Sequence, residues 1–117
     1  TTVVYKNNTP KAVQDCHELI LWIMIHLDKF PRKRRYTLGS KIENALLEIL
    51  EYLIQAAFMR QGKKAMLQQA NLKLEVIRHL WRLSLESKAI AYKQYDYGLA
   101  SMNSLGMQIG GWSKAVS

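Results

Sequence analysis

Residues 10–31, PKAVQDCHELILWIMIHLDKFP, decide the fold because they describe one amphipathic helix with both ends marked. Apolar residues recur at alternating spacings of three and four, the pattern of one helix face. They are Val13, Cys16, Ile20, Ile23 and Leu27. Thr9 and Pro10 suit the N-cap and first helical positions, and Phe30-Pro31 stops the helix because a residue before proline avoids the helical region. We therefore expect a helix over about residues 10–29.

The same periodicity recurs over about residues 37–61, 63–87 and 92–113. Thr37 suits the N-cap of the first of these helices, and Gly62 would end it as a C-terminal glycine. The three apolar stripes are Ile42, Leu46, Ile49, Leu53 and Ala57; Met66, Ala70, Leu74, Ile77 and Trp81; and Tyr95, Leu99, Met102, Leu105, Ile109 and Trp112. Four such helices with short loops predict an all-α, up-down-up-down four-helix bundle, a single domain over residues 1–117 with a tail at 1–8.

Two of these helices carry more apolar surface than a lone bundle uses, which is about 100° of each helix. A second row along 63–87 comprises Leu72, Val76, Leu80 and Leu83, and residues 97–113 contain no charged residue. A wide core face is one explanation, but we favour a homo-oligomer in which both helices are buried on two sides. The expected interface residues are Leu72, Val76, Leu80, Tyr97, Ala100, Ser104 and Met107. Gly106 and Gly110 would permit a close helix crossing.

The positive charge of the chain is concentrated at the predicted loops. The sequence has 17 Lys and Arg against 9 Asp and Glu, a net charge of +8, and the stretch 29–35, KFPRKRR, is the densest basic run. We expect this run in the loop between the first two helices. In an up-down bundle that loop shares one end with Lys88 and Lys93. The opposite end receives Arg60, Lys63 and Lys64, together with Lys6 and Lys11.

Clustered basic residues suit contacts with phosphates, which give affinity with little sequence reading. A solubilising charge run is the alternative, but the two-ended arrangement favours nucleic-acid binding. The expected contacts are Arg32, Lys33, Arg34, Arg35, Arg60, Lys63 and Lys64. Tyr36 and Phe30 flank the run, where an aromatic ring could stack on a base, although we expect Phe30 in the core.

Chemistry beyond binding has no support in the sequence. The single cysteine, Cys16, forms no intramolecular disulfide and is expected to be a buried apolar residue. The longest apolar run, residues 19–25, is too short to cross a membrane, and without a recognisable signal peptide the expected location is cytoplasmic. Glu-x-x-His pairs and phosphate-binding glycine loops do not occur. We therefore expect no metal, cofactor or catalytic residue.

Several short motifs follow one another in a fixed order along the chain. Phe30-Pro31 and a basic stretch precede Tyr36-Thr37-Leu38-Gly39, which opens a long helix. Ala56-Ala57, Ile77-Arg78, Trp81-Arg82-Leu83, Lys93-Gln94-Tyr95 and Gly110-Gly111-Trp112 follow. In this order and spacing the motifs resemble the accessory variability determinant (Avd) proteins of diversity-generating retroelements, and the resemblance covers about residues 10–115. A sister group, the four-helix proteins encoded in ribosomal-RNA intervening sequences, is the second possibility.

The resemblance implies a four-helix bundle that assembles into a pentameric, positively charged barrel. It implies a non-catalytic subunit that binds the retroelement's reverse transcriptase and its template RNA, with DNA as a further partner. Arg78 and Arg82 are carried over as RNA or reverse-transcriptase contacts, although their spacing from Glu75 and Glu86 also predicts a salt-bridged, solvated face. A protein-only oligomeric scaffold remains the alternative from another class.

Overall fold

The computed structural model describes residues 10–116, which form four long helices and no strand. The long helices are α1 (Lys11–Leu27), α3 (Ser40–Phe58), α4 (Lys63–Glu86) and α5 (Tyr92–Ala115). A short helix, α2 (Arg32–Arg34), and a π-helical turn, η1 (Arg35–Gly39), lead into α3. The predicted all-α four-helix bundle is confirmed. The predicted tail at 1–8 and the predicted N-cap Thr9 lie outside the described residues.

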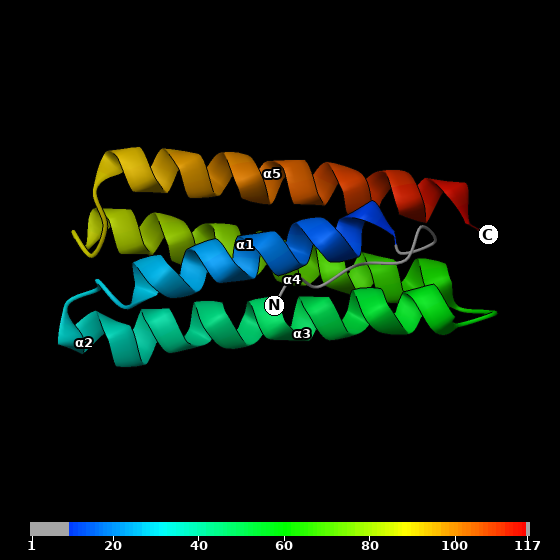
Figure 1. Cartoon of the computed structure of the whole chain (residues 1–117), viewed down its shortest axis with the longest axis horizontal. Coiled ribbons are helices and arrows are strands. Elements are labelled where there is room, and N and C mark those ends of the chain that lie inside the picture. Colours follow the sequence, from blue (N-terminus) through cyan, green and yellow to red (C-terminus); the bar gives the residue numbers. More distant parts are fainter. Residues whose placement is uncertain (1–9, 117) are drawn as a thin grey trace, which may run out of the picture.

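The four long helices form an elongated bundle with sequential neighbours side by side (Figure 1). α1 packs against α3 and α5, and α4 packs against the same two helices, so each long helix touches the next along the chain. The connection from α1 to α3 and the connection from α4 to α5 lie at one end of the bundle (Figure 1). The α3–α4 connection lies at the other end, as the up-down order requires.

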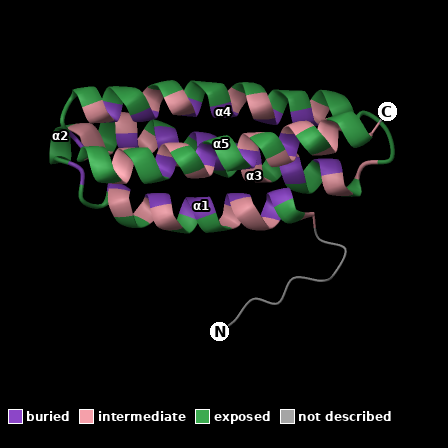
Figure 2. Ribbon diagram, turned by 90° about the horizontal axis from the view of Figure 1, so that it is seen from above, coloured by how far each residue is buried: buried purple, intermediate pink, exposed green. Residues whose placement is uncertain are grey.

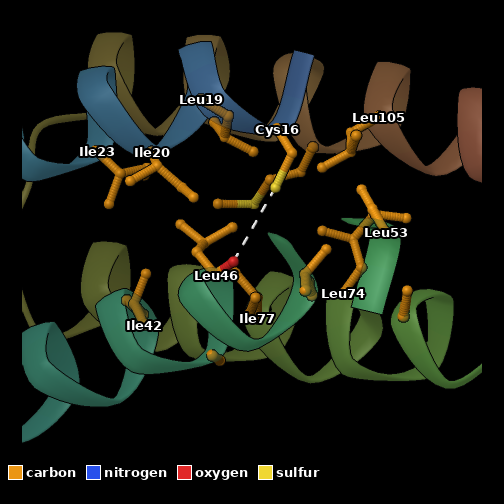
Figure 3. Packing of buried hydrophobic residues seen from close by; sticks show 14 of the residues in the cluster. Cys16, Leu19, Ile20, Ile23, Ile42, Leu46, Leu53, Leu74, Ile77 and Leu105 are labelled. Carbon is orange, nitrogen blue, oxygen red and sulfur yellow. Dashed lines mark hydrogen bonds between the residues drawn. The ribbon is translucent and has the colours of Figure 1, made fainter. Parts of the chain in front are cut away.

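The core is built from the apolar stripes that the sequence predicts. Buried residues recur along each helix between exposed ones (Figure 2), and at the centre Cys16, Ile20, Leu46, Leu74 and Leu105 converge from all four helices (Figure 3). Two stripe ends shift by one residue, because Ala56 and Leu67 are buried in place of Ala57 and Met66. Burial of this apolar surface is the main force that holds the bundle together.

One close approach fixes how α4 and α5 pack. Trp81 is fully buried, and its indole N–H donates to the backbone oxygen of Tyr95 at 2.9 Å. Gly98 lies so close to this ring that a β-carbon there would stand 2.7 Å from Trp81 Cζ2.

Gly106 faces Arg78 of α4 in a similar way. These two glycines therefore serve packing inside one chain. The expectation of a close crossing at Gly106 and Gly110 is met at Gly106 by the chain's own α4, whereas Gly110 makes only an ordinary contact.

The helix ends differ from the predicted ones in two places. Helical turns begin at Arg32, five residues before Thr37, and the Thr37 hydroxyl bonds the backbone oxygen of Lys33 inside those turns. Thr37 is therefore not an N-cap. Gly62 has φ +79° and directly precedes α4, whereas α3 ends at Phe58, so Gly62 shapes the start of α4 and does not cap α3. Within residues 10–116, no helix is both long enough and apolar enough to span a membrane.

Candidate nucleic-acid interface

The basic run is helical from Arg32 onward, which corrects the expectation of a loop. Pro31 takes an extended conformation, φ −54° and ψ 144°, and its backbone oxygen accepts bonds from the N–H groups of Arg34 and Arg35 at 2.8 and 2.9 Å. Proline suits the start of a helix because its φ is already fixed and it has no N–H to leave unpaired. The same residue thus ends α1 and begins the helical turns that carry the charges.

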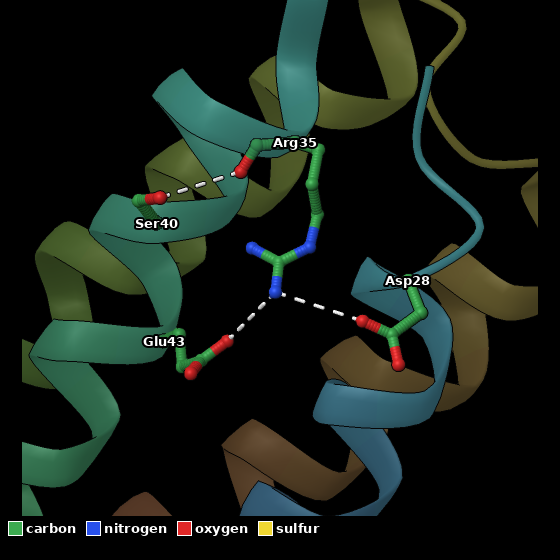
Figure 4. A network of polar contacts seen from close by, with 4 residues as sticks. All are labelled: Asp28, Arg35, Ser40 and Glu43. Carbon is green, nitrogen blue, oxygen red and sulfur yellow. Dashed lines mark hydrogen bonds and ion pairs between the residues drawn. The ribbon is translucent and has the colours of Figure 1, made fainter. Parts of the chain in front are cut away.

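Arg35 differs from the other basic residues of this run. Its Nη2 lies 3.6 Å from Asp28 Oδ1 and 3.5 Å from Glu43 Oε1, and its side chain is only 27% exposed (Figure 4). The Ser40 hydroxyl donates to its backbone oxygen at 3.4 Å. Arg35 therefore ties the end of α1 to the start of α3. The only sequence signal for this role was the presence of two carboxylates, one on each side of the run.

The three basic residues of α2 carry charge that no nearby carboxylate neutralises. Within residues 10–116, Arg32, Lys33 and Arg34 form no ion pair, and the first two are exposed. Lys88 and Lys93 are exposed in the α4–α5 connection and at the start of α5, at the same end of the bundle (Figure 1). We call these five residues the α2 end. Their grouping agrees with the prediction that the two connections share an end.

Lys88 is held in an unusual backbone conformation. Its φ is +64°, the left-handed region that favours glycine. The N–H of Ala89 bonds the oxygen of Ser84 at 2.8 Å, and the N–H of Lys88 bonds the oxygen of Leu85 at 2.9 Å. This bond pair is the Schellman motif that closes many helix C-termini, usually with glycine at this position. A lysine here costs stability and places a cation at the α2 end.

The remaining predicted cations lie elsewhere. Arg60, Lys63 and Lys64 belong to the α3–α4 connection and the start of α4, at the opposite end of the bundle (Figure 1). Arg60 and Lys64 are exposed and Lys63 is half-buried. The nine candidate residues therefore do not form one site. They divide between the two ends of the bundle and the C-terminal half of α4, and Lys6 lies outside the described residues.

Arg78 and Arg82 are engaged within the chain. Arg78 Nε donates to Asn103 Oδ1 at 2.9 Å, and its Nη1 pairs with Glu75 at 2.9 Å while the side chain covers Gly106. Arg82 pairs with Glu86 at 3.0 Å. These ion pairs form the salt-bridged face that the spacing of the two arginines from Glu75 and Glu86 predicts. Lys73 is similarly paired, and its hydrogen bond to Glu48 raises the pKa of Lys73.

The residues expected at a subunit interface lie mostly on the surface. Leu72 is 64% exposed and Met107 is 77% exposed, and they line an open groove of about 640 Å³ between α4 and α5. Val76, Tyr97, Ala100 and Ser104 are exposed, and Leu80 is half-buried. Sequence reasoning missed the exposed apolar residues of α1 and α3, which are Leu21, Ile25, Leu47, Ile54 and Phe58. The unbroken apolar run at 19–25 was the available signal for the two on α1.

Cys16 is unsuited to chemistry. Its side chain is fully buried, its sulfur lies 4.0 Å from the backbone oxygen of Leu46 (Figure 3), and burial raises the pKa of the thiol from 9.0 to about 12. The thiolate is the reactive form, so this thiol is protected from both oxidation and alkylation. In the described part of the chain, no group of three His, Cys, Asp or Glu residues could hold a metal ion.

Comparison with known protein families yields a match that covers nearly the whole chain. A protein-family model described as bAvd-like matches residues 12–116. No curated protein matches the chain. The matched range includes all four long helices apart from Lys11 at the start of α1, and it includes the basic run and the residues of the α2 end. The resemblance drawn from the short sequence motifs is thereby confirmed.

Proposed function

This chain belongs to the bAvd-like family, and on that premise we propose that it is a non-catalytic accessory subunit of a diversity-generating retroelement. In this role it binds the element's reverse transcriptase and template RNA, or DNA, and supports mutagenic cDNA synthesis and retrohoming. The observation that carries the nucleic-acid part is the α2 end. Arg32, Lys33 and Arg34 lie at the same end of the bundle as Lys88 and Lys93, and within residues 10–116 none of the first three is neutralised by a carboxylate.

A salt titration tests this binding. We expect the logarithm of the affinity for template RNA to fall linearly with the logarithm of the salt concentration, because phosphate contacts release counterions. Changing Arg32, Lys33 and Arg34 to glutamine should flatten the slope, by about 0.7 for each phosphate of a single strand that the variant no longer neutralises. The matched variant changes Arg60, Lys63 and Lys64, which removes the same charge at the opposite end. Affinity that does not respond to salt would overturn the proposal.

We propose self-assembly as the second part of this function, with a pentamer as the expected state. Its support is the exposed apolar surface of α4 and α5, where Leu72, Val76 and Met107 lie open to solvent. Light scattering should give a mass five times the 13.5 kDa of one chain. Val76→Glu should yield monomers, whereas Ile54→Glu, a change at an exposed apolar residue of α3, should not. A monomeric wild-type chain at micromolar concentration would refute this part.

Partner capture separates the proposed function from a protein-only scaffold. If the reverse transcriptase stays bound after nuclease treatment and the purified chain does not shift template RNA, the scaffold is correct. A neighbouring reverse-transcriptase gene with a template and variable repeat pair distinguishes a retroelement subunit from a ribosomal-RNA intervening-sequence protein.

A further inference from the structure

Aromatic rings lead from the core of the bundle to the surface of the α2 end. Phe30 and Trp81 are buried with their ring centroids 6.4 Å apart, and Trp81 lies 6.5 Å from Tyr95 with the two rings 18° from parallel. Tyr95 in turn lies 6.3 Å from Tyr92. Tyr92, the outermost ring, is 67% exposed. The exposed Tyr92 ring thus lies against Tyr95, which in turn lies against the buried Trp81 ring.

A second exposed ring stands at the same end. Tyr36 follows the basic run directly, in η1, and it is 69% exposed. The turn that carries it is held by the bond between the Thr37 hydroxyl and the Lys33 oxygen at 3.0 Å. Both rings are close in sequence to cations, because Tyr92 precedes Lys93 and Tyr36 lies two residues after Arg34. The start of α5, which bears Tyr92, and the helical turn that bears Tyr36 share one end of the bundle (Figure 1).

Exposed tyrosines are common one at a time. Two of them interleaved with unneutralised cations form the combination that single-strand binders use, in which bases stack on aromatic rings while phosphates contact Lys and Arg. A duplex keeps its bases stacked on one another, so its bases cannot reach either ring. The neighbouring Tyr95 ring favours stacking on Tyr92, because a ring that is already held in place loses little conformational freedom when a base stacks on it.

We propose that the α2 end binds single-stranded nucleic acid in preference to duplex, with unpaired bases stacked on Tyr92 and Tyr36 and phosphates held by Arg32, Lys33 and Arg34. The inference rests on the proposed function and adds to it the form of nucleic acid that this end selects.

Fluorescence anisotropy with a short labelled RNA strand, alone and annealed to its complement, tests the preference. The full chain should bind the single strand more tightly than the duplex. Tyr92→Leu and Tyr36→Leu should each weaken single-strand binding by about fivefold or more. Tyr92→Phe is the matched control, because it keeps the ring, and it should bind like the wild type. Circular dichroism confirms that every variant is folded.

The salt dependence separates the two kinds of contact. The leucine variants should lose affinity with an unchanged salt slope, because stacking releases no counterions, whereas neutralising Arg32, Lys33 and Arg34 should flatten the slope. Equal affinity for both RNA forms, with leucine variants that match the wild type, would overturn this inference and leave the proposed function standing. If neither RNA form binds at low salt, both fall.

Discussion

The contact between Gly98 and Trp81 makes Gly98→Ala the most informative change to the fold. A β-carbon at residue 98 would lie 2.7 Å from Trp81 Cζ2 and 2.8 Å from Nε1, well inside van der Waals contact. The Trp81 ring cannot easily withdraw. It is fully buried, it is bonded to the Tyr95 backbone, and it lies against the rings of Phe30 and Trp22.

Three effects set the magnitude. Overpacking a filled core costs about 1–3 kcal/mol. If the ring shifts, the indole N–H loses its bond to the Tyr95 oxygen, and a buried donor without a partner costs about 1–3 kcal/mol more. Alanine in place of glycine inside a helix returns about 1 kcal/mol. We therefore expect Gly98→Ala to lower the free energy of unfolding by about 3 kcal/mol. This loss corresponds to a melting temperature lower by about 10 °C.

Gly111→Ala is the matched control in the same helix. A β-carbon at Gly111 meets no atom within 4 Å, so only the gain in helix propensity remains, and the variant should be more stable by up to about 1 kcal/mol. Urea unfolding followed by circular dichroism at 222 nm measures both variants, at one fixed chain concentration because assembly would contribute to stability. If Gly98→Ala proves as stable as Gly111→Ala, the packing argument is wrong.

Three further predictions concern single residues. Lys88→Gly should raise the free energy of unfolding by about 1 kcal/mol in the same urea assay, because it relieves the left-handed strain; no gain would contradict the strain argument. Arg35→Gln should cost about 1 kcal/mol, since Asp28 and Glu43 lose their shared partner, whereas Arg34→Gln should change stability by less than about 0.5 kcal/mol. Burial raises the pKa of Cys16 from 9.0 to about 12, so the folded chain favours the neutral thiol. The contribution of this thiol to the free energy of unfolding is therefore complete below pH 9 and is lost between pH 9 and 12. Between pH 8 and 10.5 the wild type should lose about 2 kcal/mol more than Cys16→Ala; equal losses would show that the thiol ionises freely in the folded state.

The helices and their inward faces were predictable because each rests on local periodicity. Cys16, Ile20, Leu46 and Leu74 are buried as their three-and-four spacing indicates, and the spacing of a helix face depends on nothing beyond the helix itself. The up-down order of the helices also predicted that the α1–α3 and α4–α5 connections share one end of the bundle. Phe30, which a motif alone could have assigned to base stacking, is 5% exposed and packs on Trp81.

The features that the sequence did not predict depend on atoms brought together by the fold. Arg35 is paired because Asp28 and Glu43 converge on it from two helices, and no spacing rule covers residues separated by a change in chain direction. The helical turn before Thr37 arises from Pro31, which was interpreted only as a stop signal for α1. Lys88 adopts a conformation in which glycine is usual, so composition gave no sign of it.

The small residues of α5 illustrate how the structure redirects an argument about assembly. Gly98 and Gly106 are explained within one chain, by Trp81 and Arg78, so they give no support to contacts between copies. Ala100, Ser104 and Met107 have no such explanation, because they are exposed on the outer side of an α5 segment without charge. Self-assembly thus rests on this outer row of α5 together with the exposed Leu72 and Val76 of α4. If copies are related by rotation about an axis parallel to the helices, every α2 end lies on one face of the ring. A single strand that leaves one end then meets the next at high effective concentration, so weak stacking at each Tyr92 adds up to stable binding.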